Sequence, residues 1–215
     1  MTRAGNSGGG AVADRVTTLA ELTAIYGAPV EAATVKERLQ LTPLYRELIA
    51  ASPFAVLATS GPGGLDCSPR GDRPGFVRIL DDRTLALPDR RGNNRVDSLR
   101  NIVSDPRVAL LFLIPGSGTT FRVNGRATIS RAAGLCASFA AGGSAPRTVI
   151  VIDIDAAYFQ CARAVVRAGL WSAAAQVEAA ALPSPGAMLA EASDNRVGGA
   201  DYDRDWPARA AASLW

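Results

Sequence analysis

The chain has 215 residues, of which 48% are hydrophobic and 20% are charged, and this is long enough for one substantial core. Its formal net charge is +3, so composition favours neither a nucleic-acid-binding protein nor a membrane-surface protein. The sequence contains no histidine, the commonest general base and transition-metal ligand. A hydrolase with a Ser-His-Asp triad is therefore nearly excluded, and we expect no metal site.

Arginine supplies almost all of the positive charge, because Lys36 is the only lysine. Any anion site would therefore use guanidinium groups and backbone amides. The three cysteines, Cys67, Cys136 and Cys161, form no zinc or redox motif and are expected to be reduced. No apolar run approaches the ~20 residues that span a bilayer, and the N-terminus has no signal-peptide pattern. We expect a cytoplasmic protein.

The first quarter of the chain predicts helices. Residues 1–14 are rich in glycine and are expected to be disordered. Residues 15–53 contain two helical patterns, "TLAELTAIYG", which ends at Gly27, and "TPLYRELIAAS", in which Thr42 can cap the helix and Pro43 suits its first turn. We interpret this part as a helical extension.

From Phe54 onward the pattern is that of short strands. The runs "FAVLATS", "LDCSPR", "FVRIL" and "TLALP" are separated by turn signals and predict an antiparallel meander. A helix is expected at 95–103, followed by "RVALLFLI" as a strand buried on both faces. The clearest strand is "TTFRVNGRATIS", in which apolar and polar residues alternate strictly.

The rest of the chain predicts a helix at 132–140, a strand "TVIVIDI", a helix within "FQCARAVVRAGLW", and one or two helices in the tail. Six or more strands interrupted by helices favour a closed or nearly closed β-barrel. In the helix near the end of this segment, Cys161 is interpreted as a buried small hydrophobe rather than a nucleophile.

Three segments could carry chemistry. In "LALPDRRGNNRVDSLRNI", Gly92 permits a sharp or positive-φ turn before a helix, and free amides at a helix N-terminus favour an anion. The alternative is that Asn93 or Asn94 caps the helix while the arginines are solvated. In "CSPRGD", a proline and a glycine flank Arg70, which suits either a ligand-facing backbone or an ordinary connection.

The third segment is the polar face of the clearest strand, which carries Thr120, Arg122, Asn124 and Arg126. This face is either exposed to solvent, in contact with another subunit, or part of a binding site. The sequence contains neither GxxxxGK[ST] nor GxGxxG, so Walker-type and Rossmann nucleotide sites lose their main support.

Taken in order, "SPRGDRPGFVRILDDRTLALPDRRGNNRVDSLRNIVSDPRVALLFLIPGSGTTFRVNGRATI" resembles the FMN-binding split-barrel flavoproteins, the pyridoxamine 5′-phosphate oxidase-like superfamily. The resemblance spans roughly Phe54 to Trp171. It implies a mainly β fold with α, a six-stranded Greek-key split barrel with peripheral helices, and a homodimer with FMN at the subunit interface. The expected domains are 54–171 for the split barrel and 172–215 for a C-terminal helical and loop extension.

The resemblance also implies cofactor-binding residues. The turn that binds the FMN phosphate in the family corresponds to Gly92, Asn93, Asn94 and Arg95. The strand segment that lines the flavin corresponds to Ser68, Arg70 and Asp72. The strand that faces the isoalloxazine ring corresponds to Thr120 and Arg122. Arg163 is a weaker candidate, and Arg90 and Arg91 are left without an assigned role. The resemblance identifies no catalytic residue.

The same comparison argues against the namesake reaction, because genuine pyridoxamine-phosphate oxidases carry an Arg-x-His pair near the C-terminus and this chain has no histidine. The resemblance implies an FMN-dependent oxidoreductase acting on a small molecule, with NADH or NADPH as a candidate partner. The alternative is a non-catalytic protein that binds or sequesters FMN, or a cleft that holds haem or a deazaflavin. A nucleic-acid-binding barrel is disfavoured because only 6% of residues are aromatic.

Overall fold

The computed structural model describes residues 15–214, and these fall into two compact units that divide between Lys36 and Glu37. The tail predicted to be disordered, residues 1–14, lies outside the described residues. In the first unit, α1 (Leu19–Tyr26) begins with a capping box in which Thr18 and Glu21 exchange hydrogen bonds. The helix ends at Gly27, as predicted, and α2 (Glu31–Thr34) follows.

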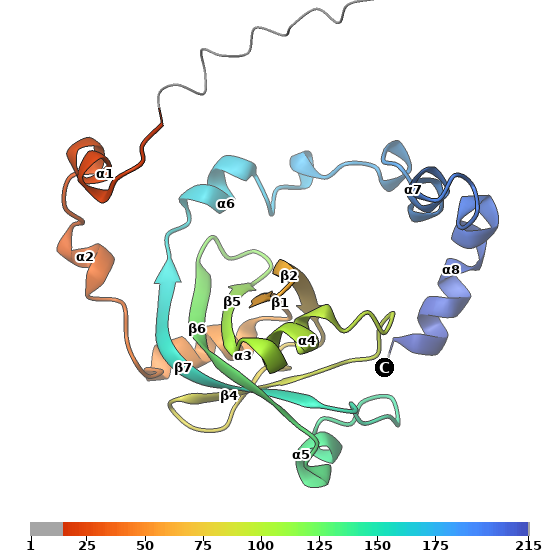
Figure 1. Cartoon of the computed structure of the whole chain (residues 1–215), viewed down its shortest axis with the longest axis horizontal. Helices are drawn as coiled ribbons and strands as arrows, with labels where there is room; N and C mark the ends of the chain where they lie inside the picture. The colour runs from red at the N-terminus through yellow and green to blue at the C-terminus, as the bar shows by residue number, and fades with distance from the viewer. Residues whose placement is uncertain (1–14, 215) are drawn as a thin grey trace, which may run out of the picture. The chain divides into compact units, whose positions relative to one another are not determined.

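The second unit is built on one antiparallel sheet (Figure 1). Its strands are β1 (Phe54–Gly61), β2 (Gly64–Gly71), β3 (Arg78–Ile79), β4 (Thr84–Pro88), β5 (Arg107–Leu113), β6 (Thr120–Ser130) and β7 (Val149–Gln160), in the order β2-β1-β5-β6-β7-β4-β3. The mainly β fold with helices is confirmed. The count of six strands is wrong, because the short β3 forms a seventh.

The predicted meander is also wrong. β1 pairs with β2, and β3 pairs with β4, as short turns between antiparallel strands require. However, β2 and β3 lie at opposite edges of the sheet, with all the other strands between them. The segment from Gly71 to Arg78 therefore connects the two edges instead of making a hairpin.

One face of the sheet forms the core. The residues Ala55, Phe112 and Phe121 are paired across β1, β5 and β6, and all three are fully buried. Helix α3 (Pro43–Ala51) begins with the predicted Thr42 cap and packs Tyr45 against Phe121, with ring centroids 5.0 Å apart. Helix α4 (Asp97–Ser104) adds Ile102 to the same core.

Strand β5 was expected to be buried on both faces, and this is wrong. Val108, Leu110 and Phe112 are buried, but the residues between them are half-buried. The outer face of the sheet is therefore apolar and incompletely covered along β1 and β5. Leu111 on β5 and Arg122 on β6 are paired on this outer face.

Strand β6 alternates as predicted and is bent at one glycine. Its register against β7 shifts between Asn124 and Gly125, which marks a β-bulge. A Cβ atom at Gly125 would lie 2.2 Å from the carbonyl oxygen of Asp153, so only glycine allows the two strands to approach so closely. The bulge increases the local curvature of the sheet.

Strand β7 extends six residues beyond "TVIVIDI" and includes Phe159 and Gln160, which were expected to be helical. Helix α6 (Arg163–Ala168) starts only afterwards, so Cys161 lies before the helix. The interpretation of Cys161 as a buried hydrophobe is wrong, because the residue is exposed while Val165 fills the buried position.

The remaining helical elements are α5 (Ala133–Ser138), the 3-10 turns η1 (Ala173–Ala175) and η2 (Ala179–Ala181), and helices α7 (Pro185–Ala192) and α8 (Gly199–Ser213). The tail thus holds two α-helices, within the expected range. Asp203 of α8 accepts hydrogen bonds from Ser184 Oγ and from the Gly186 amide at the start of α7. Among residues 15–214, no helix combines the length and apolarity needed to cross a bilayer.

Asp105 is the C-cap of helix α4, and its amide donates to the Asn101 carbonyl at 2.7 Å. The Asp105 carboxylate accepts hydrogen bonds from the side chain and amide of Arg107. These bonds hold the pKa of Asp105 at about 2, below its ordinary 3.8. Because the folded pKa is the lower one, the stabilisation is present above about pH 3.8 and is lost as the pH falls toward 2.

We therefore expect Arg107→Ala to raise the pKa of Asp105 toward 3.8, because the guanidinium bonds that favour the carboxylate are removed. Carboxyl carbon shifts followed through an NMR pH titration measure this directly. Arg204→Ala, at an exposed position on α8, is the control and should leave Asp105 unchanged. An unaltered Asp105 pKa in Arg107→Ala would contradict the assignment.

Candidate functional site

Two of the predicted segments lie side by side in the fold. Arg70, near the end of β2, donates from Nη1 to Asp89 Oδ1 at 2.9 Å. Arg90 donates from Nε to Asp72 Oδ2 at 2.7 Å, and its Nη2 lies 2.7 Å from the same oxygen. The segment "SPRGD" is thus bound through crossed ion pairs to the segment that starts "DRRGNN".

The crossed ion pairs have a consequence for the shape of the sheet. β2 is one edge strand, whereas Asp89 and Arg90 directly follow β4, next to the opposite edge. Side chains can bridge these strands only if the sheet curls until its two edges approach one another. The sheet is therefore curved, and the crossed ion pairs link the end of β2 to the segment that follows β4.

The crossed ion pairs are also poorly hydrated. The side chains of Arg70 and Asp89 are 17% and 19% exposed, and the side chain of Asp72 is 5% exposed. Charges withdrawn from water in this way interact more strongly than exposed ones, and removal of one partner leaves the other uncompensated. The pairs are therefore expected to be more rigid than surface salt bridges.

The turn that follows differs from its predicted form. The left-handed residues are Asn94, with φ 60°, and Val96, with φ 52°, whereas Gly92 is not among the residues with positive φ. A β-branched residue in this region is an outlier that costs on the order of 1–3 kcal/mol. Gly92 thus does not supply the left-handed step that the sequence suggested.

The alternative that Asn93 or Asn94 caps the helix is wrong. α4 begins at Asp97, two residues later than expected, with Val96 as its N-cap and no side-chain hydrogen bond to the cap. Asn93 instead accepts a hydrogen bond from the Arg95 amide at 3.1 Å, within the turn. Arg95 itself is 77% exposed and donates from Nε to Asp97 Oδ2 at 2.7 Å.

Two hydrogen bonds that sequence reasoning missed hold α4 against the β1–β2 hairpin. Ser98 Oγ donates to Asp66 Oδ2 at 2.7 Å, and Asn101 Nδ2 donates to Thr59 Oγ1 at 3.1 Å. Ser98 and Thr59 are each 3% exposed. The only signal in the sequence is that Ser98 and Asn101 are spaced to share one helix face. These bonds fix the start of α4 and therefore the turn before it.

The remaining predicted site residues divide between the two faces of the sheet. The residues Arg70, Ala55, Phe112 and Phe121 are paired in one row across four strands. Paired residues share a face, so Arg70 lies on the core side, as does Ser68 two residues earlier. Thr120 and Arg122 flank Phe121 and therefore lie on the opposite side, where the Arg122 guanidinium is 5.2 Å from the Tyr158 ring.

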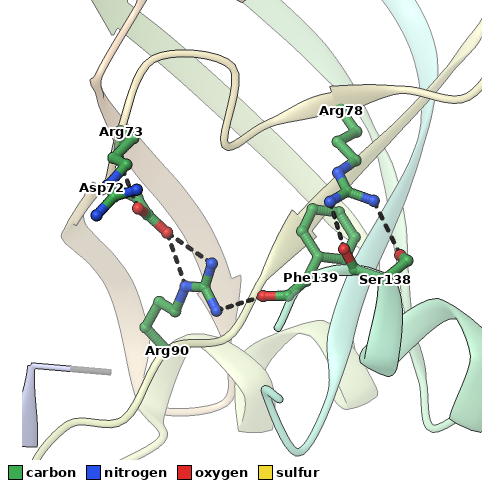
Figure 2. A network of polar contacts seen from close by, with 6 residues as sticks. All are labelled: Asp72, Arg73, Arg78, Arg90, Ser138 and Phe139. Carbon is green, nitrogen blue, oxygen red and sulfur yellow. Dashed lines mark hydrogen bonds and ion pairs between the residues drawn. The ribbon is translucent and has the colours of Figure 1, made fainter. Parts of the chain in front are cut away.

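A second set of polar contacts extends from the crossed ion pairs (Figure 2). Arg90 donates from Nη1 to the Phe139 carbonyl at 2.7 Å, and Arg78 donates to Ser138 Oγ at 2.9 Å and to the Ser138 carbonyl. The Arg78 guanidinium also lies 4.1 Å from the centroid of the Phe139 ring. Sequence reasoning left Arg90 unassigned and did not single out Arg78, because their partners lie far along the chain.

Two buried side-chain atoms in the described part of the chain lack a hydrogen-bond partner, Arg70 Nε and Thr148 Oγ1. Both belong to residues that contact Asp89, since the Thr148 carbonyl accepts from the Asp89 amide at 3.1 Å. A buried donor without an acceptor is unfavourable by about 1–3 kcal/mol unless a ligand or water satisfies it. The surroundings of Asp89 therefore suit a ligand that presents acceptor oxygens. No group of residues suited to a metal ion occurs in residues 15–214.

Comparison with models of known protein families identifies the family of this chain. Residues 41–161, more than half of the chain, match the model of the pyridoxamine 5′-phosphate oxidase family. The chain belongs to this family. The resemblance inferred from the sequence is thereby confirmed, and the matched range contains every predicted cofactor-binding residue except the weaker candidate Arg163. No curated protein matches the chain.

Solved structures are similar at low identity. HupZ of Group A Streptococcus is 18% identical, with 53% of this chain and 89% of that chain covered and a TM-score of 0.44. A putative pyridoxamine 5′-phosphate oxidase from Lactobacillus delbrueckii is 21% identical, with 56% and 95% covered and a TM-score of 0.45. A FAD-binding protein from Mesorhizobium loti is 17% identical, with 57% and 96% covered and a TM-score of 0.39.

A double-mutant cycle tests the strength of the crossed ion pairs. For Asp72→Asn and Arg90→Gln we expect a coupling free energy of about 1–3 kcal/mol, because the Asp72 carboxylate is nearly buried. The matched control is the exposed pair Asp201 and Arg204, for which at most about 0.5 kcal/mol is expected. Urea unfolding of the four variants of each cycle gives both values. Equal coupling in the two cycles would show that the crossed pair behaves as a surface salt bridge.

Proposed function

We propose that the protein is an FMN-binding flavoprotein, an FMN-dependent oxidoreductase acting on a small molecule. The observation that carries this proposal is the crossed pairing of "SPRGD" with the segment starting at Asp89, in a chain of the pyridoxamine 5′-phosphate oxidase family. That pairing gathers the two predicted flavin segments around a buried guanidinium whose Nε has no acceptor.

The residues present fit an anionic cofactor. Arg70 Nε–H and the Thr148 hydroxyl offer buried hydrogen-bonding groups beside Asp89. Asn93, Asn94 and Arg95 offer further donors in the turn, and the start of α4 carries no side-chain cap. In this proposal Arg95 exchanges Asp97 for the FMN phosphate, while Ser68 and Asp72 line the flavin.

Bound FMN would supply the two-electron redox chemistry. The chain's own residues would bind and orient it, and NADH or NADPH is the proposed electron donor. The Asp72–Arg90 pair would hold the strand segment and the turn at a fixed separation. We propose no catalytic side chain.

The same proposal includes a homodimer of curled, split-barrel subunits. Thr120 and Arg122 lie on the outer face of the sheet, away from Arg70, so one subunit does not unite the predicted site. Val56, Ala58, Ala109 and Leu111 make that face apolar and half-buried. A second subunit packed there would cover the apolar strip and bring its own Thr120 and Arg122 to the interface.

Fluorescence quenching of FMN tests the cofactor site. Arg70→Ala and Arg95→Ala are each expected to weaken FMN binding by about 1.5–3 kcal/mol, as for loss of a charge-assisted hydrogen bond. Arg100→Ala, at an exposed position on α4, is the matched control. Dissociation constants unchanged in both site variants, or no FMN binding by the unaltered protein, would refute the assignment. Anaerobic addition of NADH or NADPH then distinguishes an oxidoreductase, whose flavin is bleached, from a protein that only sequesters FMN.

Sedimentation velocity tests the dimer. Leu111→Arg places a charge on the apolar outer face and is expected to convert the dimer to monomer and to weaken FMN binding with it. Val103→Arg is the control, because Val103 is 79% exposed on α4. A monomeric unaltered protein, or a Leu111→Arg variant that remains dimeric with intact FMN binding, would contradict this interface.

A further inference from the structure

We propose that Asp89 is a positioning residue that, through Arg70, sets the reduction potential of the bound flavin. Asp89 holds the Arg70 guanidinium so that its Nε–H donates to an uncharged acceptor on the isoalloxazine ring. This inference rests on the proposed FMN binding, and it names the part of the cofactor that Arg70 contacts. Asp89 itself is assigned no contact with the cofactor.

The two crossed ion pairs use their guanidinium groups differently. In one pair, Arg90 places both Nε and Nη2 on the same oxygen of Asp72. In the other pair, Arg70 donates to Asp89 from Nη1 at 2.9 Å, and its buried Nε has no hydrogen-bond partner among residues 15–214. A guanidinium can use Nε together with a terminal nitrogen to bind one carboxylate. The pair of Arg70 with Asp89 therefore leaves open the donor that the pair of Arg90 with Asp72 fills.

Asp89 holds Arg70 from a fixed position. The Asp89 amide donates to the Thr148 carbonyl at 3.1 Å, directly before β7 begins. The side chains of Arg70 and Asp89 are 17% and 19% exposed, so solvent screens their attraction less than that of an exposed pair. Because the guanidinium is planar, a partner on Nη1 restricts the direction in which Nε–H points. The Nε–H is therefore a preorganised donor, and a ligand that accepts its hydrogen bond removes an unfavourable buried group.

The charge of the pair selects the kind of acceptor. Asp89 already compensates the charge of Arg70. A phosphate bound to the Arg70 Nε would also approach the Asp89 carboxylate, and like charges repel one another strongly in a poorly hydrated site. A carbonyl oxygen or a ring nitrogen of the isoalloxazine accepts the same hydrogen bond without that repulsion. Arg95 is better suited to the phosphate, because its side chain is 77% exposed and its pair with Asp97 is a surface salt bridge.

Reduction of the flavin changes the electrostatic balance at this acceptor. Two-electron reduction gives the isoalloxazine a negative charge at neutral pH, and nearby protein charges tune a flavin through that difference. Arg70 then stabilises the reduced form, whereas the Asp89 carboxylate opposes it. The two residues are therefore expected to shift the reduction potential in opposite directions. A purely structural ion pair would not do so, because loss of either partner would remove the same contact.

The reduction potential of bound FMN, measured anaerobically against a reference dye, tests this inference. Asp89→Asn leaves Arg70 uncompensated and is expected to strengthen the binding of reduced relative to oxidised FMN about tenfold, which raises the potential by about 30 mV. Arg70→Gln removes the positive charge and the Nε donor, and a shift of similar size in the opposite direction is expected. Asp89→Glu restores the carboxylate and should return the potential toward that of the unaltered protein. Asp201→Asn, at an exposed position on α8, is the matched control and should leave the potential unchanged.

Two further measurements separate the possible failures. Fluorescence quenching shows whether each variant is saturated with FMN, and thermal unfolding shows whether it is folded. If Arg70→Gln does not fold, the rise in Asp89→Asn and its reversal in Asp89→Glu decide the question. Bound FMN whose potential moves in the same direction in Asp89→Asn and Arg70→Gln, or does not move, would overturn this inference and leave the proposed FMN site standing. Absence of FMN binding by the unaltered protein would overturn both.

Discussion

The crossed ion pairs of Arg70 with Asp89 and of Arg90 with Asp72 are the constraint on which the site depends. They connect segments that lie near opposite ends of the strand order, so these segments meet only because the sheet is curved. The pairs are also largely withdrawn from water, where an uncompensated charge is unfavourable. Loss of one pair would therefore affect both the curvature of the sheet and the positions of the two segments predicted to bind the flavin.

The turn between the crossed pairs and α4 is constrained from both sides. Asp89 and Arg90 fix its beginning, and the buried Ser98 and Asn101 bonds fix the helix that follows. A chain held at both ends has few ways to cross the gap, which accounts for a valine in the left-handed region at position 96. Such strain persists only where the surroundings over-determine the backbone. The contacts on both sides of the turn therefore restrict its backbone.

Local patterns predicted local structure. The alternation in β6, the Thr42 cap and the end of α1 at Gly27 all follow from short-range rules, and the structure confirms them. The sheet order and the register shift at Gly125 depend on contacts between distant residues, so the meander was wrong. The apolar run of β5 concealed an alternation, because the outer-face residues are themselves apolar and only half-buried.

The partners of the arginines in the candidate site could not be predicted from local sequence patterns either. The family resemblance identified Arg70 and Asp72 as candidates, but it did not identify Asp89 and Arg90 as their partners. Ion pairs between residues that are distant in the sequence produce no recognisable pattern in either segment. Arg90 then joins two regions, because the same guanidinium binds Asp72 and the Phe139 carbonyl. Asp72 is accordingly a shared wall between the proposed flavin segments and a cavity at the end of α5. Removal of the Asp72 charge would therefore alter the surroundings of Arg90 in both regions, since the same carboxylate oxygen binds its Nε and Nη2 atoms.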